Sequence, residues 1–312
     1  MTACSARASE IGETLPGTAP RNRSWVVLEH AGAFGRVALL DSGLPETLGR
    51  YLEDARTASS TGVLLARRAE GEQSHGTRIW LATCGPGASR MRKVELSEGE
   101  PIPHLEIGLI GEGQLPGLGQ TSTDPVLFIC TNGKRDVCCA VEGRSLVNAL
   151  AADGNIASAV WESSHQGGHR FAPVALLLPH GYSYGRLTAA AATEVLQAAR
   201  NGELPVTGLR GRTSLPRTAQ AAEVIIRRSY DVRGIDDLDV LARDSRNRAL
   251  ALSATADAGP ERMEVRHRDG RAWWVDARLE QLRPATPESC GKGPAERTTV
   301  VITRVSEAGA WR

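Results

Sequence analysis

Two cysteines and two histidines are spaced as a set that could hold a metal centre. Eight residues separate Cys130 from Cys139, and three separate His165 from His169. Thiolate sulfur and imidazole nitrogen suit zinc or an iron–sulfur cluster, whereas calcium and magnesium require oxygen ligands. Zinc knuckles usually place their cysteines two to four residues apart. The longer loop between Cys130 and Cys139 therefore favours a larger metal centre, such as a 2Fe–2S cluster. From these residues alone, zinc and iron both stay open.

The residues next to these ligands allow other chemistries. Cys138 adjoins Cys139 and is an equally good second thiolate on chemical grounds. The pair Cys138 and Cys139 also suggests a thiol oxidoreductase, although that chemistry typically uses Cys-x-x-Cys, because adjacent cysteines close only a strained ring. A zinc protease is excluded, because Gln166 stands where its general-base glutamate is needed. Gly167 and Gly168 disfavour a helix and allow the chain to curl around a cluster.

The cysteine and histidine runs resemble those of the sucrase/ferredoxin-like proteins, which are thioredoxin-like ferredoxins with a His-x3-His pair in place of a second cysteine pair. Stretches along most of the chain look like landmarks of that family: Cys4-Ser5, Gly17-Thr-Ala-Pro20 before Trp25, Leu178-Pro179, Tyr184-Gly185-Arg186 and Ser289-Cys290-Gly291. The resemblance implies a 2Fe–2S cluster with four protein ligands. These ligands, called the cluster ligands below, are Cys130, Cys139, His165 and His169. The resemblance also favours Cys139 over Cys138 as the second cysteine ligand.

A cluster of this kind predicts a function. Neutral imidazoles in place of thiolates lower the negative charge of the centre, so its reduction potential should exceed that of an all-cysteine ferredoxin. The second ring nitrogen of a ligating histidine should become more basic on reduction, which couples the electron to a proton and makes the potential pH-dependent. Basic residues are predicted to surround the cluster, where they steer an acidic partner or donate hydrogen bonds. They are Lys134, Arg135, Arg170 and Arg186.

The expected protein is therefore an electron carrier, or the redox component of a reductase, and not a stand-alone hydrolase. No flavin or nicotinamide motif is present, so a separate redox partner protein should supply the electrons. Two other functions stay open: a structural zinc module that presents the C-terminal segment to a partner, and a thiol oxidoreductase using Cys138 and Cys139. No catalytic residue is predicted for the electron carrier.

Composition limits the classes of partner and compartment. A chain of 312 residues with 41% hydrophobic content can bury a core, and its net charge of +1 with 4% aromatic residues argues against nucleic-acid binding. No apolar stretch approaches the roughly 20 residues that cross a bilayer, and six cysteines are too sparse for a secreted disulfide framework. We therefore expect a soluble, cytoplasmic protein. The spacings of three cysteines indicate no metal site or disulfide, so these residues are predicted to be packed, inert thiols. They are Cys4, Cys84 and Cys290.

Hydrophobic patterns predict an α/β fold in three parts. Strands are expected at Ser24–Glu29, Thr61–Arg67, Thr77–Thr83, 125–130, 156–161 and 173–178, and helices at 44–56, 140–152 and 188–200. An N-terminal α/β domain (1–115) is interpreted as a degenerate thioredoxin-like half without ligands. A Gly- and Pro-rich linker (111–125) leads into a thioredoxin-like ferredoxin domain (116–215). Its order places Cys130 at a strand end and Cys139 at a helix entry, so the cluster ligands should meet at one edge.

The remaining residues (216–312) are predicted to form a small α+β accessory segment of winged-helix-like form. It would contain a helix at 218–228 and strands at 248–252, 263–268, 271–275 and 298–303.

Overall fold

The computed structural model describes residues 3–69, 76–243, 249–250 and 261–309. Its strands are β1 (Ser24–Glu29), β2 (Thr61–Arg67), β3 (Thr77–Thr83), β4 (Arg90–Leu96), β5 (Gln120–Thr121), β6 (Val126–Cys130), β7 (Val160–Ser163), β8 (Ala175–Leu178), β9 (Tyr182–Tyr184), β10 (Leu209–Arg212), β11 (Leu238–Arg243), β12 (Ala249–Leu250), β13 (Arg262–His267), β14 (Ala272–Gln281), β15 (Thr286–Pro287), β16 (Pro294–Ala295) and β17 (Thr298–Glu307). Its helices are α1 (Cys4–Glu10), α2 (Ala38–Asp41), α3 (Glu46–Ala58), α4 (Ile107–Gly111), the π-helix η1 (Cys139–Gly143), α5 (Arg144–Ala151), the 3₁₀ turns η2 (Ala157–Ala159) and η3 (His169–Phe171), α6 (Ala189–Arg200) and α7 (Arg217–Tyr230).

One mixed sheet of ten strands forms the main layer, in the order β10-β9-β8-β6-β7-β2-β1-β3-β4-β5. In its first half β1 runs parallel to β2 and antiparallel to β3, and β3 pairs with β4. In its second half β6 runs parallel to β7 and antiparallel to β8, and β8 pairs with β9. The two halves thus share one strand connectivity, and the antiparallel pair of β2 with β7 joins them. The α/β class predicted from the sequence is confirmed.

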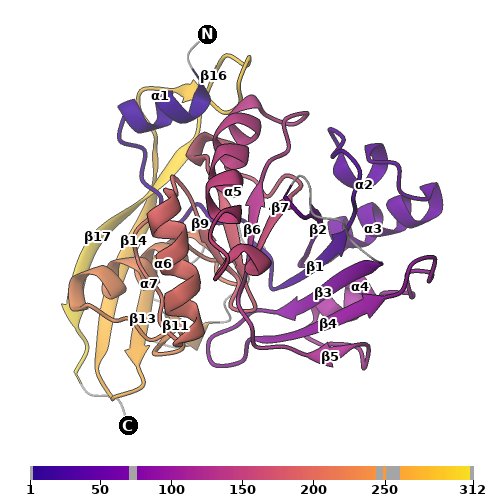
Figure 1. Cartoon of the computed structure of the whole chain (residues 1–312). Helices are drawn as coiled ribbons and strands as arrows, with labels where there is room; N and C mark the ends of the chain where they lie inside the picture. Colours follow the sequence, from indigo (N-terminus) through magenta and orange to yellow (C-terminus); the bar gives the residue numbers. More distant parts are fainter. Residues whose placement is uncertain (1–2, 70–75, 244–248, 251–260, 310–312) are drawn as a thin grey trace.

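Helices from both halves cover the sheet. In Figure 1, α2 and α3 lie beside the first half and α5 and α6 beside the second. Helix α5 buries Leu146, Val147 and Leu150 against Leu127 and Ile129 of β6, which anchors the helix that follows Cys139. Full burial of such a side chain contributes roughly 2 kcal/mol.

The opposite face of the sheet carries a core common to both halves. The Trp80 ring lies 4.7 Å from that of Trp161 and 5.2 Å from that of Phe128, each measured between ring centroids and each in an edge-on arrangement. Trp80 belongs to β3, whereas Phe128 and Trp161 belong to β6 and β7. The predicted boundary at residue 115 therefore falls within one continuous sheet and core, and the three-part division stays a prediction.

The observed elements follow the predicted ones closely where long apolar runs are present. The strands Ser24–Glu29, Thr61–Arg67 and Thr77–Thr83 have the predicted bounds. The helix predicted at 188–200 is α6, and Thr188 caps it, since its Oγ1 accepts a hydrogen bond from the Ala191 N–H at 3.2 Å. Elsewhere the prediction was wrong in detail. Residues 157–159 form the turn η2 rather than strand, and the supposed linker 111–125 contains β5.

The C-terminal segment packs α7 on a five-stranded antiparallel sheet of order β12-β11-β13-β14-β17. This agrees with an α+β segment. A winged helix also requires a second helix for its helix-turn-helix, and α7 is the single helix among the described residues of this segment, so the winged-helix-like form is not found there. Of the predicted strand 248–252, residues 249–250 form β12, and the others lie outside the described residues. Among all described helices, none is long and apolar enough to cross a membrane.

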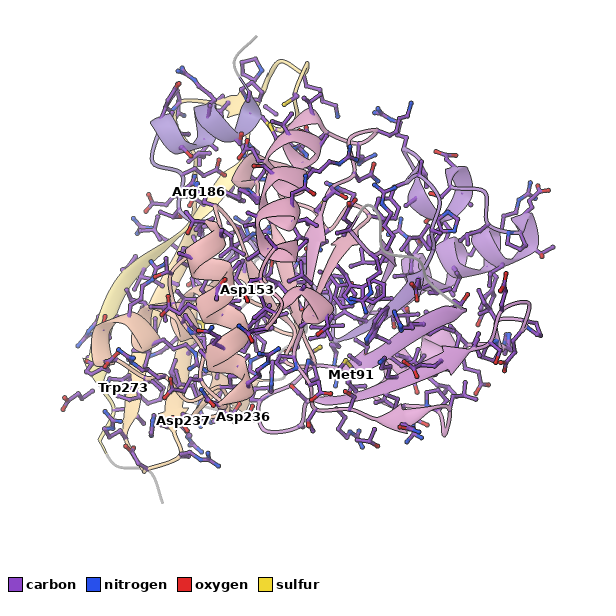
Figure 2. The ribbon with its side chains drawn as sticks, in the orientation of Figure 1. Met91, Asp153, Arg186, Asp236, Asp237 and Trp273 are labelled. Carbon is purple, nitrogen blue, oxygen red and sulfur yellow. The ribbon has the colours of Figure 1, made fainter. Side chains whose placement is uncertain are left out.

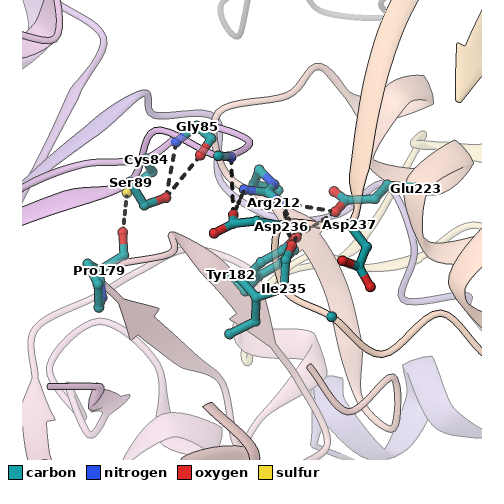
Figure 3. Close-up of polar contacts among 12 residues, drawn as sticks. Cys84, Gly85, Ser89, Pro179, Tyr182, Arg212, Glu223, Ile235, Asp236 and Asp237 are labelled. Carbon is teal, nitrogen blue, oxygen red and sulfur yellow. Dashed lines mark hydrogen bonds and ion pairs between the residues drawn. The ribbon is translucent and has the colours of Figure 1, made fainter. Parts of the chain in front are cut away.

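A buried charge network joins α7 to the edge of the main sheet (Figure 3). Glu223 Oε1 lies 3.3 Å from Arg212 Nη2 and 3.0 Å from Arg227 Nη2, and it accepts a hydrogen bond of 2.5 Å from the Tyr182 hydroxyl. All four side chains are almost fully buried. Burial alone would raise the pKa of Glu223, but the two guanidinium groups hold it below its usual value.

The N-terminal helix packs against the C-terminal segment. Figure 1 shows α1 beside β16, although the two lie near opposite ends of the sequence. Glu13, just after α1, is buried and lies 3.1 Å from Arg297 Nη1, which precedes β17. Glu13 also lies 2.8 Å from Arg170 Nε in η3. These contacts bring residues from both ends of the chain to the loop that carries the histidines.

Candidate metal centre

The two proposed cysteine ligands meet at the carboxyl end of β6. Cys130 is the last residue of that strand and Cys139 the first of η1, and both are fully buried. A Cβ on Gly143 would collide with the Cys130 carbonyl oxygen. Glycine at this position therefore lets η1 lie directly against the end of β6, which brings the two thiols together.

His165 completes the closest group. The Sγ atoms of Cys130 and Cys139 and one ring nitrogen of His165 all lie within 4.8 Å of one another. His165 is half-buried, and its Nδ1 is buried without a hydrogen-bond partner among the described residues. Buried polar atoms are nearly always paired. An imidazole held next to two buried thiols, with one buried ring nitrogen unpaired among the described residues, fits a ligand set for a metal centre.

His169 lies beside this group. Its ring centroid is 5.4 Å from that of His165, although its nitrogens fall outside the 4.8 Å group. Nδ1 lies 3.0 Å from Asp136 Oδ2. Metal-ligating histidines typically donate their other ring N–H to such a carboxylate. Asp136 thus fixes the ring and leaves Nε2 available as a ligand.

Two glycines shape the turn between the histidines. Gly167 and Gly168 have φ angles of 84° and 78°, in the left-handed region that glycine adopts without strain. A Cβ on Gly168 would collide with the Arg210 guanidinium, which donates to the Gly167 carbonyl at 3.3 Å and to Ser183 Oγ at 3.1 Å. Arg210 therefore holds the turn between His165 and His169 in place.

Arg210 was not predicted as a site residue. Its side chain is buried, and burial lowers its pKa to about 9, a shift that the Cys139 thiol partly opposes. Arg210 lies in β10, whose sequence Leu-Arg-Gly-Arg lacks the apolar alternation that signals a strand.

The four predicted basic residues divide into two pairs. Arg170 and Arg186 lie 4.4 and 5.4 Å from the Phe171 ring, which packs against Cys130 and Cys139. Arg186 lies below α1 in Figure 2 and donates to the Ala8 carbonyl at 3.2 Å.

The other pair consists of Lys134 and Arg135, which are exposed on the loop between the two cysteines. Their contact with a partner stays a prediction.

Three further thiols meet next to this site, in an arrangement called the three-thiol site below. Cys4 Sγ lies 3.4 Å from Cys138 Sγ, Cys138 Sγ lies 3.1 Å from Cys290 Sγ, and Cys290 Sγ lies 3.6 Å from Cys4 Sγ. Cys4 and Cys290 are packed thiols, as expected, but they also contact each other and Cys138, which their spacing in the sequence did not indicate. Cys138 turns toward them, while Cys139 turns toward Cys130.

Cys84, by contrast, is a packed thiol as predicted. It lies outside both groups, and its Sγ donates to the Pro179 carbonyl at 3.3 Å (Figure 3). Burial raises the pKa of this thiol to about 12.

Asp136 connects the two groups. Its Oδ1 accepts from the Cys138 N–H at 2.9 Å, and its Oδ2 accepts from the Cys290 N–H at 3.0 Å and from Ser289 Oγ at 2.9 Å, besides the contact with His169. Burial would raise its pKa, but these hydrogen bonds lower it well below its usual range. The carboxylate thus stays ionised between the histidine and the three-thiol site.

The cluster-ligand group and the three-thiol site each contain one cysteine whose thiol pKa is lowered. A hydrogen bond from the Cys139 thiol, against the effect of burial, lowers the pKa of Cys130 well below its usual value. A hydrogen bond from the Cys4 thiol, with help from Ser5, lowers the pKa of Cys138 to about 5. Since the thiolate is the form that binds metals, both groups have the chemistry of metal ligands.

Comparison with known proteins gives one match. The family model described as sucrase/ferredoxin-like matches residues 18–211, which is more than half of the chain and includes all four cluster ligands. Comparisons with curated proteins and with solved structures gave no match. The family name, the resemblance of the ligand runs and the metal-binding chemistry of the site agree, and the chain belongs to the sucrase/ferredoxin-like family.

Proposed function

We propose that the protein is a one-electron carrier whose 2Fe–2S cluster is held by the four cluster ligands. The observation that carries this proposal is the group of Cys130, Cys139 and His165, in which two fully buried Sγ atoms and one imidazole nitrogen all lie within 4.8 Å of one another. The Asp136–His169 pair supports it, because it has the form of a histidine held ready for a metal. The cluster would supply one-electron redox chemistry, with the cysteines on one iron and the histidines on the other.

The surrounding residues define the properties of this carrier. Cys130 and Cys139 are fully buried, whereas His165 is half-buried, so electrons and protons would enter on the His165 side. The buried guanidinium of Arg210 lies near Cys139 and would favour the more negative, reduced state. We therefore assign a potential above that of an all-cysteine ferredoxin.

The fold fits the same proposal. The shared βαβββ connectivity of the two halves supports a thioredoxin-like ferredoxin half preceded by a related half without ligands. Cys130 occupies the end of β6, while β1, the corresponding strand of the first half, ends at Glu29. The first half would thus act as a scaffold.

The partner is proposed to be a separate acidic redox protein. Lys134 and Arg135 are exposed beside Val137, which is 60% exposed, and Val141, which is 64% exposed. A positive rim with exposed apolar side chains suits transient docking. Electron exchange with anionic hexacyanoferrate should slow as salt rises, and a rate independent of salt would remove this steering role. The six free cysteines favour a reducing compartment, for which we propose the cytoplasm.

The test of the cluster is the visible absorption spectrum of protein purified without oxygen. We expect a red-brown protein whose absorption bleaches when dithionite is added, with two iron atoms and two sulfides per chain. A colourless protein that contains zinc, and that gains no colour when iron and sulfide are supplied, would instead support the structural zinc module.

Proton coupling has a separate test, the reduction potential as a function of pH. Coupling of one proton to one electron changes the potential by about 59 mV per pH unit over the coupled range. We expect such a slope between about pH 6 and 9 for the wild type, since a ligating histidine with a free ring nitrogen titrates near this range. The His165→Cys variant should retain a cluster at a lower potential with a smaller slope. A wild-type potential that is flat across this range would contradict the coupling.

A further inference from the structure

Three cysteines from distant parts of the sequence form a triangle of sulfur atoms. Cys4 lies in α1, Cys138 precedes η1, and Cys290 lies between β15 and β16. The three Sγ–Sγ distances are 3.1, 3.4 and 3.6 Å. Cys4 and Cys138 are each 2% exposed and Cys290 is half-buried. Three separate segments thus present thiols to one enclosed point.

We infer that Cys4, Cys138 and Cys290 bind one zinc ion, with Asp136 as the fourth ligand. None of these four residues is a cluster ligand, although Asp136 and Cys4 both contact His169, and the inference does not depend on the proposed function. Three thiolates and a carboxylate suit a borderline-soft ion and do not suit calcium or magnesium.

The size of the triangle favours a single ion. Zinc–sulfur bonds of about 2.3 Å in a tetrahedral site place neighbouring sulfurs about 3.8 Å apart. The observed edges of 3.1, 3.4 and 3.6 Å are somewhat shorter, so a small outward movement of the thiols would admit one ion. A disulfide needs a sulfur–sulfur distance of about 2.05 Å and would leave the third thiol without a role. An iron–sulfur cluster would spread three cysteines over several irons, which sets their sulfurs farther apart.

Asp136 has one oxygen suited to the fourth position. Oδ2 already accepts from the Cys290 N–H and the Ser289 hydroxyl and lies 3.0 Å from His169 Nδ1. Oδ1 accepts from the Cys138 N–H and from the Cys4 thiol, whose proton a zinc ion would replace. Oδ1 lies 3.8 Å from Cys4 Sγ, a separation similar to the edges of the triangle. The four ligand atoms all lie within 4.8 Å of one another.

The surroundings offset the negative charge of such a site. The Cys4 N–H donates to Cys290 Sγ at 3.5 Å, and the Ser5 hydroxyl donates to Cys138 Sγ at 3.3 Å. Hydrogen bonds to thiolates stabilise their negative charge. Together with the zinc cation they would stabilise this buried anionic group of ligands.

The experiment measures zinc and iron per chain by mass spectrometry of metals in the full chain purified without oxygen. Because zinc can also enter an empty cluster site, the decisive protein is the Cys130→Ser variant. We expect it to lose iron and retain one zinc ion per chain, whereas a Cys130→Ser/Cys290→Ser double variant should lose both. Adding Co²⁺ to the metal-free Cys130→Ser protein should give intense sulfur-to-cobalt absorption, which should be absent from the double variant.

Controls keep the result unambiguous. Cys84→Ser removes a buried thiol outside both sites and should change neither metal. Cys290 is the most exposed of the three thiols, so its replacement is the one most compatible with folding, and circular dichroism of the double variant checks this. If the double variant does not fold, the cobalt spectrum of Cys130→Ser alone decides, since tetrahedral thiolate ligation has a characteristic visible absorption.

Three results would overturn the inference. The first is Cys130→Ser protein that binds neither zinc nor cobalt, and the second is a Cys138–Cys290 disulfide in wild-type protein that was purified without oxygen and alkylated without reductant. Iron without zinc in the wild type would also overturn it while leaving the proposed function intact. Zinc in Cys130→Ser, together with a wild type that never takes up iron, would support this site and contradict the electron carrier.

Discussion

Replacing Cys139 with alanine is expected to abolish the visible absorption of the cluster and to reduce its iron to a trace. Cys139 is fully buried against Cys130 and His165, so its loss removes one of two thiolates from the same iron. Cys138→Ala is the matched control one residue away. It should keep the colour, because its side chain contacts Cys4 and Cys290 instead. Iron and sulfide content, with the absorption spectrum, measure the outcome.

The two variants together decide which adjacent cysteine is the ligand. Colour retained in Cys139→Ala and lost in Cys138→Ala would reverse the assignment. The same pair separates the two metals, since Cys138→Ala should lose zinc while Cys139→Ala keeps it. Loss of both metals in both variants would mean that the loop folds only as a unit, and the assignment of separate sites would fail.

The Glu223→Gln variant is expected to lower the free energy of unfolding by about 3–5 kcal/mol, because removing one partner leaves a buried charge uncompensated. Arg212 and Arg227 are both fully buried, and Glu223 is the carboxylate within 3.3 Å of each. Asp236 also lies near Arg212, but at 4.0 Å and partly exposed, so it compensates the buried guanidinium less well. Urea unfolding followed by circular dichroism measures the change.

Glu46→Gln provides the control for the same substitution at the surface. Glu46 pairs with Arg50, and both side chains are more than two-thirds exposed. Such exposed pairs contribute less than about 1 kcal/mol. Equal losses in Glu223→Gln and Glu46→Gln would show that the buried network does not hold α7 to the sheet.

The parts of the fold that the sequence predicted are those with uninterrupted apolar runs. Strands β1, β2 and β3 are buried along almost their whole length, and their apolar residues mark their bounds. Strands β9 and β10 were missed, because Tyr182, Arg210 and Arg212 look like surface residues in the sequence. They are buried because partners far along the chain, such as Glu223, compensate their polar groups.

In the candidate site, too, the residues close together in the sequence were predicted and those brought together by distant packing were not. The pairs Cys130 with Cys139 and His165 with His169 have short spacings that can be recognised in a sequence. Cys4 and Cys290 are separated by 286 positions, and only the packing of α1 against the C-terminal segment brings them together. The role of Asp136 could not be recognised from the sequence either. It depends on the orientation of the His169 ring and of the Cys138 and Cys290 backbone N–H groups.

The position of Cys290 also has a consequence for the order of events during synthesis. The chain leaves the ribosome N-terminal end first, so all four cluster ligands emerge long before residue 290. Until then Cys4 and Cys138 lack the third thiol, and Glu13 lacks Arg297, which lies 3.1 Å from it in the finished protein. During synthesis there is thus an interval in which the candidate ligands have emerged but the three-thiol site is incomplete, and translation of the last segment ends that interval.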